Sequence, residues 1–128
     1  MKKLFVLLLS MTLATAAFAA DLKKAETEGT VSFYANMTAI EPIIADFNGS
    51  HKINGIYTRI STSKYLATVL TEHAAGKLQA DVLQGPLPVI QMLKDKGVLA
   101  PYKSSSAAGY PAWASADDTI LQFGIEYV

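Results

Sequence analysis

Residues 30–49 read TVSFYANMTAIEPIIADFNG and hold a complete strand–loop–helix unit. The β-branched and aromatic residues of Thr30–Tyr34 predict a strand. Thr38 stands three residues before Glu41, which is the spacing of a capping box at the start of a helix. Apolar residues then recur at helical intervals as far as Asn48–Gly49, where we expect the helix to end.

The same unit recurs twice more along the chain. Strands are predicted at Ile56–Ile60 and Ala80–Leu83, and helices at Lys64–Ala75 and Pro88–Lys96. Gly97 is placed to end the last helix in the left-handed conformation. Strands and helices that alternate over short connections predict an α/β fold with a parallel sheet covered on both faces. The connection lengths allow the first strand to lie between the other two, and we expect this order.

Length and composition fit one globular domain. The chain has 128 residues, with eleven basic and eleven acidic side chains and no cysteine. Lys2 and Lys3 are two of the basic residues, so the chain after residue 19 has nine basic against eleven acidic side chains, a net charge near −2. Such a balance lacks the basic face that nucleic-acid binding needs. We also expect a further strand at Thr119–Val128, within which the chain stops.

The first nineteen residues have the features of an export signal. Lys2–Lys3 is a short positive region, Leu4–Leu13 is an apolar run, and Ala17–Ala19 is the small-x-small pattern that signal peptidase recognises. About ten apolar residues are too few to span a bilayer, which takes about twenty. We therefore expect residues 1–19 to be a removable signal peptide and residues 20–128 to work in the periplasm. Because no cysteine is present for a lipid anchor, the mature protein should be soluble and should not span the membrane.

Three loops are expected to meet at the carboxyl edge of the sheet, where open α/β sheets bind ligands. Each loop carries neutral hydrogen-bonding groups and leads into a helix, whose free backbone N–H groups favour anions. The alternative, which each loop alone leaves open, is that the Ser and Thr side chains only cap the helices. The candidate ligand-binding residues are Tyr34, Asn36, Met37 and Thr38 in the first loop, Ser61, Thr62 and Ser63 in the second, and Gln84, Gly85 and Pro86 in the third.

Residues 80–102, ADVLQGPLPVIQMLKDKGVLAPY, resemble the third strand and helix of the periplasmic solute-binding proteins of ABC importers. The resemblance is to the group that includes ferric-iron and phosphonate binders, and Val31–Ala35 and Asp46–Phe47 match it as well. It implies a type II periplasmic-binding-protein fold, in which two lobes close on a small polar or anionic solute and deliver it to a permease in the inner membrane. It implies no cofactor. On this resemblance the chain is expected to be a partial N-terminal lobe, truncated, with the second lobe absent.

Three alternatives are left open. Iron(III) prefers oxygen ligands, often with an imidazole, and the first loop has no His or carboxylate before Glu41. A small polar or anionic solute is therefore expected, with iron(III) or an iron–anion complex as the further option. A small exported hydrolase could use the helix starts as an anion site, but Ser61 and Ser63 lack an elbow motif. His51 is interpreted as a solvated loop residue and His73 as a packing residue at a helix edge. We expect no catalytic residues and no metal ligands, and a gene fragment without function is the third alternative.

Overall fold

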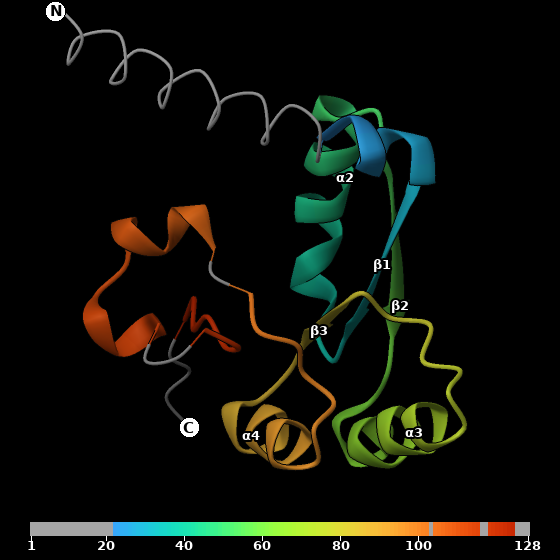
Figure 1. The fold of residues 1–128 in the computed structure, drawn as a ribbon, viewed down its shortest axis with the longest axis vertical. Coiled ribbons are helices and arrows are strands. Elements are labelled where there is room, and N and C mark those ends of the chain that lie inside the picture. The colour runs from blue at the N-terminus through green and yellow to red at the C-terminus, as the bar shows by residue number, and fades with distance from the viewer. Residues whose placement is uncertain (1–21, 103, 116–117, 125–128) are drawn as a thin grey trace, which may run out of the picture.

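The computed structural model describes residues 22–102, 104–115 and 118–124. Residues 22–28 are helical and lead into the first strand. The signal peptide expected at residues 1–19 lies outside the described residues. Among those described, no helix is both long and apolar enough to cross a membrane. The elements that follow are β1 (Thr30–Ala35), η1 (Thr38–Ile40), α2 (Glu41–Ser50), β2 (Asn54–Arg59), α3 (Thr62–Ala74), β3 (Val82–Gln84), α4 (Leu87–Asp95), η2 (Ser105–Gly109) and η3 (Ala112–Ser115), as Figure 1 shows.

The three strands form a parallel sheet in the order β2-β1-β3. The α/β class, the parallel pairing and the central place of the first strand are therefore confirmed. The first strand begins at Thr30 as predicted, and the other strand bounds differ from those predicted by one or two residues. β3 begins after Asp81, whose backbone N–H donates to the Ser32 carbonyl over 2.9 Å and whose carboxylate accepts from the Ser32 N–H over 2.8 Å. Asp81 thus fixes the register at the start of this pairing.

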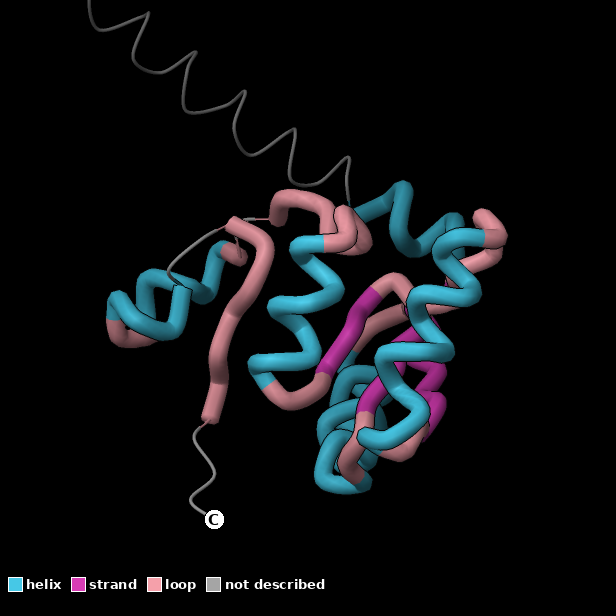
Figure 2. Tube along the Cα trace, turned by 90° about the horizontal axis from the view of Figure 1, so that it is seen from below, coloured by secondary structure: helices cyan, strands magenta, loops and turns pink. Residues whose placement is uncertain are grey.

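Helices cover both faces of the sheet, as predicted. Neighbouring residues of a strand point to opposite faces, and Phe33 and Tyr34 of β1 divide in this way. On the first face, Phe33 packs edge-on against Phe47 of α2, with ring centroids 6.3 Å apart. On the second face, Tyr34 belongs to the main apolar core, together with buried residues of α3 and α4; Figure 2 views the molecule from the end where these two helices lie. That core is made by Tyr34, Tyr65, Val69, Ile90 and Leu93.

The capping box expected at the start of α2 is wrong. Thr38 begins a short 3₁₀ turn, and Ile40 takes the N-cap position of α2 without any side-chain hydrogen bond. The Glu41 N–H bonds instead to the backbone carbonyl of Thr38, which the tighter turn brings within reach. Because the backbone already satisfies this donor, the two side chains have no capping role.

The end of α2 also differs from the prediction. The helix passes through Asn48 and ends at Ser50. The Asn48 amide serves another element: its Oδ1 accepts from the Gly55 N–H over 2.6 Å, and its Nδ2 donates to the Gly55 carbonyl over 3.1 Å. Asn48 therefore joins α2 to β2 rather than ending the helix.

The last part of the chain is less regular than expected. Gly97 has φ 72°, so its predicted left-handed conformation after α4 is confirmed. Within the described part of the predicted strand, residues 119–124, only Ile120 lies in a β-bridge. The Gln122 backbone N–H donates to the Ala114 carbonyl over 2.7 Å, and its side chain donates to the Trp113 carbonyl over 3.0 Å. These bonds hold the segment against η3, so the strand prediction is wrong for these residues, while residues 125–128 lie outside the described part.

Candidate functional site

Hydrogen bonds join the three predicted loops at the carboxyl edge of the sheet. The Asn36 amide donates from Nδ2 to the Thr62 Oγ1 over 3.1 Å, which links the first loop to the second. The Gln84 amide donates from Nε2 to the Met37 sulfur over 3.3 Å, which links the third loop to the first. The loops therefore meet as expected, because parallel strands end at one edge of the sheet and these side chains bridge the ends.

Each of the three helical segments at this edge starts without a side-chain cap. The N-cap residues are Met37 for η1, Ser61 for α3 and Pro86 for α4, and none of them makes a side-chain capping hydrogen bond. The Ser61 hydroxyl lies 3.4 Å from that of Ser63 instead. The hydroxyls of the second loop therefore do not act as the caps that the simpler interpretation required. A helix cannot pair its own first backbone N–H groups, so the starts of η1 and α3 present donors that a ligand can use. The start of α4 offers only the Leu87 N–H, because Pro86 and Pro88 have none and Val89 and Ile90 bond to the Pro86 carbonyl.

Positive charge gathers beside the start of α3. Arg59 is the last residue of β2, Lys64 lies in the first turn of α3, and both are exposed. The first turns of α3 and α4 carry no acidic residue, and Glu41 is the acidic residue in the first turn of α2. Arg59 and Lys64 were missed as site residues, although both closely flank the hydroxyl-rich loop in the sequence. Together with the positive ends of the helix dipoles, they make the edge attractive to an anion.

A buried tyrosine holds the strand ends in place beneath the loops. Tyr65 of α3 is fully buried, and its hydroxyl donates to the backbone carbonyl of Tyr34 over 2.9 Å. The pKa of Tyr65 is raised because the side chain is buried, and a hydrogen bond with the Gln84 backbone offsets part of this rise. The hydroxyl therefore contacts both β1 and β3 just where they end. Tyr65 was not among the predicted site residues, although its spacing of four residues from Val69 marks it as a neighbour on the buried helix face.

Tyrosines also decide which predicted residues can meet a ligand. The Tyr57 hydroxyl donates to the Met37 carbonyl over 2.9 Å and holds the first loop from β2. The Tyr34 side chain is buried, and its hydroxyl donates to the Glu72 carboxylate over 3.0 Å, in the last turns of α3. Tyr34 thus points away from the edge and belongs to the core. Met37 and Thr38 are exposed, whereas Gly85 and Pro86 are half-buried.

Two acceptor oxygens at the edge are buried without a hydrogen-bond partner. They are the Asn36 Oδ1 and the Gln84 Oε1. Gln84 is the register partner of Ala35, and Asn36 follows Ala35 directly, so both oxygens belong to the ends of neighbouring strands. An unsatisfied buried polar group costs about 1–3 kcal/mol, so these two oxygens lower the stability of the strand ends.

The two histidines lie at the opposite ends of the helices from this edge. His51 is the C-cap residue of α2 and stacks on Phe47, with ring centroids 4.5 Å apart. His73 lies in the last turn of α3. Neither is placed beside the hydroxyls of the second loop, which lie at the start of that helix. Within the described ranges, no three His, Asp or Glu side chains come close enough together to hold a metal ion.

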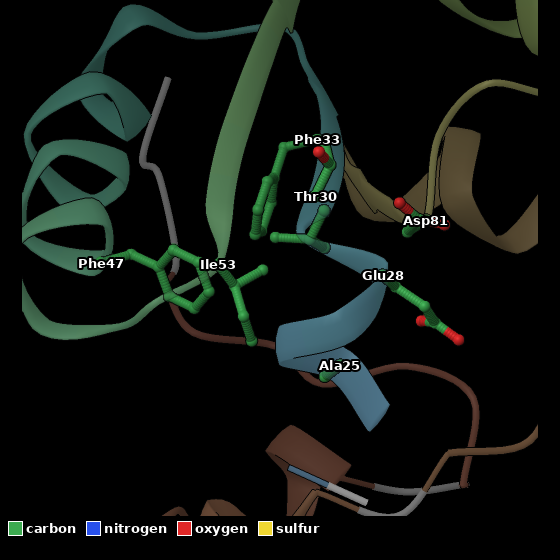
Figure 3. A pocket seen from close by; sticks show the side chains of 8 residues that line it. Ala25, Glu28, Thr30, Phe33, Phe47, Ile53 and Asp81 are labelled. Atoms are coloured by element: carbon green, nitrogen blue, oxygen red, sulfur yellow. The ribbon is translucent and has the colours of Figure 1, made fainter. Parts of the chain in front are cut away.

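A shallow hollow of about 330 Å³ lies near the amino ends of the strands, away from the carboxyl edge. Figure 3 shows Phe33, Phe47 and Ile53 on one side of it, with Glu28 and Asp81 on the other. Its walls are mostly apolar, and the Asp81 carboxylate already accepts the Ser32 N–H. The uncapped helix starts and the exposed Arg59 and Lys64 make the edge a better candidate for an anionic ligand than this hollow.

No protein-family model matches the chain, and no curated protein matches it.

Proposed function

We propose that the carboxyl edge binds a small anionic solute and that the chain is the solute-binding component of an ABC importer in the periplasm. The observation that carries the proposal is the meeting of three uncapped helical starts at one edge, beside Arg59 and Lys64. The resemblance of residues 80–102 to the solute-binding family supports the same function. So does the parallel sheet, whose loops gather at the edge where that fold takes its ligand.

The expected affinity of this edge follows from its donors. A hydrogen bond to a charged group contributes about 1.5–3 kcal/mol, and a favourable helix dipole adds about 0.3–1 kcal/mol. Two or three such contacts are reduced by the cost of immobilising the solute, which leaves a dissociation constant in about the millimolar range. In the proposed family a second lobe would supply the further contacts that tight capture needs.

The placement of the possible bases supports binding rather than hydrolysis. A serine nucleophile needs a base within hydrogen-bond reach. The partner of the Ser61 hydroxyl is the Ser63 hydroxyl, and His73 lies at the other end of α3. The Ser61 and Ser63 hydroxyls can therefore donate to a bound solute, but among the described residues no base lies beside them to accept a proton.

Export is the second part of the proposal and rests on the sequence of residues 1–19. Cleavage after Ala19 would give a mature protein that begins at Ala20. Mass spectrometry of a periplasmic fraction would show this new N-terminus. A chain recovered with Met1 in place would contradict export by this signal.

The anion site is tested by removing its positive charges. Arg59→Gln combined with Lys64→Gln should weaken the binding of inorganic phosphate by about three- to thirtyfold at low salt, measured by calorimetric titration. The matched control is Lys52→Gln combined with Lys77→Gln, which removes the same charge from exposed positions after α2 and α3. The control should keep its affinity within about twofold. Equal losses in both double variants would mean that phosphate responds only to net charge, and the proposed site would be wrong.

A further inference from the structure

Two Asn–Gly dipeptides lie on the two sides of one contact between α2 and β2. Asn48–Gly49 belongs to α2, and Asn54–Gly55 begins β2. The Asn48 Oδ1 accepts from the Gly55 N–H over 2.6 Å, and the Asn48 Nδ2 donates to the Gly55 carbonyl over 3.1 Å. The side chain of the first dipeptide therefore holds the backbone of the second.

An asparagine that precedes a glycine can react with its own backbone. The glycine nitrogen attacks the side-chain carbonyl carbon of the asparagine, the new N–C bond closes a cyclic succinimide, and the amide nitrogen leaves as ammonia with the proton of the backbone nitrogen. Water then opens the ring. Cleavage on the side-chain side leaves aspartate, and cleavage on the main-chain side leaves isoaspartate. Glycine favours the attack because it has no Cβ beside the closing ring and its backbone turns easily.

The packing of α2 on β2 favours glycine at position 55. A Cβ at this position would lie 3.0 Å from the Asn48 Oδ1 and 3.2 Å from a ring carbon of Phe47, which is closer than most such contacts in proteins. The helix can therefore approach β2 this closely because Gly55 has no side chain. The Asn54 side chain before it is exposed, so water reaches the group that reacts.

The same contact holds the reaction back in the folded protein. The Gly55 nitrogen must lose its proton and turn towards Asn54, but its N–H is donated to Asn48. The Asn54 N–H is held as well, because it donates to the Gly29 carbonyl over 2.9 Å beside β1. Gly49 is protected separately, since it lies within α2 and its N–H pairs along the helix.

We propose that Asn54 is a site of conversion to aspartate and isoaspartate, and that the Asn48 amide controls the rate by local opening of its contact with Gly55. The attacking atom is the next residue's own nitrogen, so no ligand has to enter. Isoaspartate lengthens the main chain by a methylene group and adds a negative charge where β2 pairs with Thr30 of β1. Conversion therefore loosens the amino end of the sheet. This inference is independent of the proposed anion site.

Peptide mapping of the full chain measures the conversion. Trypsin cleavage after Lys52 and Arg59 releases residues 53–59, INGIYTR, in which Asn54 is the only asparagine. After incubation in slightly alkaline buffer, chromatography and mass spectrometry separate the aspartate and isoaspartate forms of this peptide from the unchanged form. Conversion should be at least about tenfold faster in a urea-unfolded sample than in the folded wild-type protein.

Two variants separate the local contact from overall stability. Asn48→Ala removes both bonds to Gly55 and should speed the conversion of Asn54 by about five- to a hundredfold in the folded protein. Tyr65→Phe is the matched control, because it removes a buried hydrogen bond at the carboxyl edge and leaves the contact between α2 and β2 intact. The control should convert Asn54 at the wild-type rate, with circular dichroism showing that both variants are folded.

Each outcome supports or overturns the proposal. A wild-type rate in folded Asn48→Ala would show that the contact does not control the reaction, and an equal acceleration in Tyr65→Phe would show that global unfolding does. An unchanged Asn54 in urea would mean that the dipeptide is not reactive. A comparison in low urea needs no variant, because local opening exposes little surface and depends only weakly on urea. A flat rate supports control by the contact, and a rate that rises in parallel with the unfolded fraction overturns it.

Discussion

Replacing Tyr65 by Phe tests whether this side chain ties the ends of β1 and β3 together beneath the candidate site. The substitution removes one hydroxyl and keeps the ring. In the wild-type protein that hydroxyl donates to the Tyr34 carbonyl over 2.9 Å in a fully buried position, and it also contacts the Gln84 backbone. No water can replace it easily, since the surrounding residues form the main apolar core.

The expected loss follows from this geometry. A neutral hydrogen bond contributes about 0.5–1.5 kcal/mol, and leaving its buried partner unsatisfied raises the cost to about 1–3 kcal/mol. A change of 1 kcal/mol lowers the melting temperature of a domain of about this size by about 4–8 °C. Tyr65→Phe should therefore reduce the free energy of unfolding by about 1–3 kcal/mol and the melting temperature by about 5–20 °C.

Urea unfolding followed by circular dichroism measures the free energy, and a thermal melt gives the second value. Tyr102→Phe is the matched control, because Tyr102 is 76% exposed. The control should stay within about 0.5 kcal/mol of the wild-type protein. If Tyr65→Phe is as stable as Tyr102→Phe, the buried hydroxyl does not hold the two strand ends together.

Three further predictions concern other parts of the fold. Asn48→Ala should lower the free energy of unfolding by about 1–3 kcal/mol in urea titrations, because it removes both bonds to the Gly55 backbone; an unchanged midpoint would contradict the link between α2 and β2. Gly97→Ala should cost about 1–2 kcal/mol in the same assay, since its φ of 72° strains any residue with a Cβ, and a neutral result would mean that the turn after α4 relaxes. Burial raises the pKa of Tyr34 and Tyr65 in the folded state, and Glu72 adds to the rise at Tyr34. The contribution of these two tyrosines to stability should therefore be constant up to about pH 10, the ordinary pKa of tyrosine, and should be lost as the pH rises further. Melting curves across this range check it, and a Tyr65→Phe protein should show a smaller alkaline loss.

The sequence was sufficient to predict the α/β class, the parallel pairing and the strand order, because these depend on alternating patterns and short connections. The element bounds depend on contacts that a local pattern does not contain. β2 begins at Asn54, two residues before the predicted strand, and Asn and Gly are poor strand formers. Gly55 pairs there because the Asn48 amide of α2 bonds to its backbone. The same contact explains why Asn48 does not end its helix.

The candidate site was likewise predictable only in part. Its three loops were predicted correctly as neighbours, because the carboxyl ends of parallel strands meet at one edge. The direction of each side chain could not be predicted, since Tyr34 turns into the core while Asn36 stays at the edge. The support from Tyr65 and the unpaired oxygens also arise only when distant segments pack together. A sequence pattern indicates which residues come near one another, and the folded chain determines which of their atoms remain free.

The most direct test of the central claim is a map of where an anion binds. Hydrogen phosphate titrated into the isotope-labelled full chain should shift the backbone amide signals of Met37, Ser63 and Gly85, one from each loop, with a common dissociation constant. Amides around the hollow near the amino ends of the strands, such as those of Phe33 and Ile53, should not follow that curve. Shifts confined to the hollow, or scattered over the surface without saturation, would contradict a binding site at the carboxyl edge of the sheet.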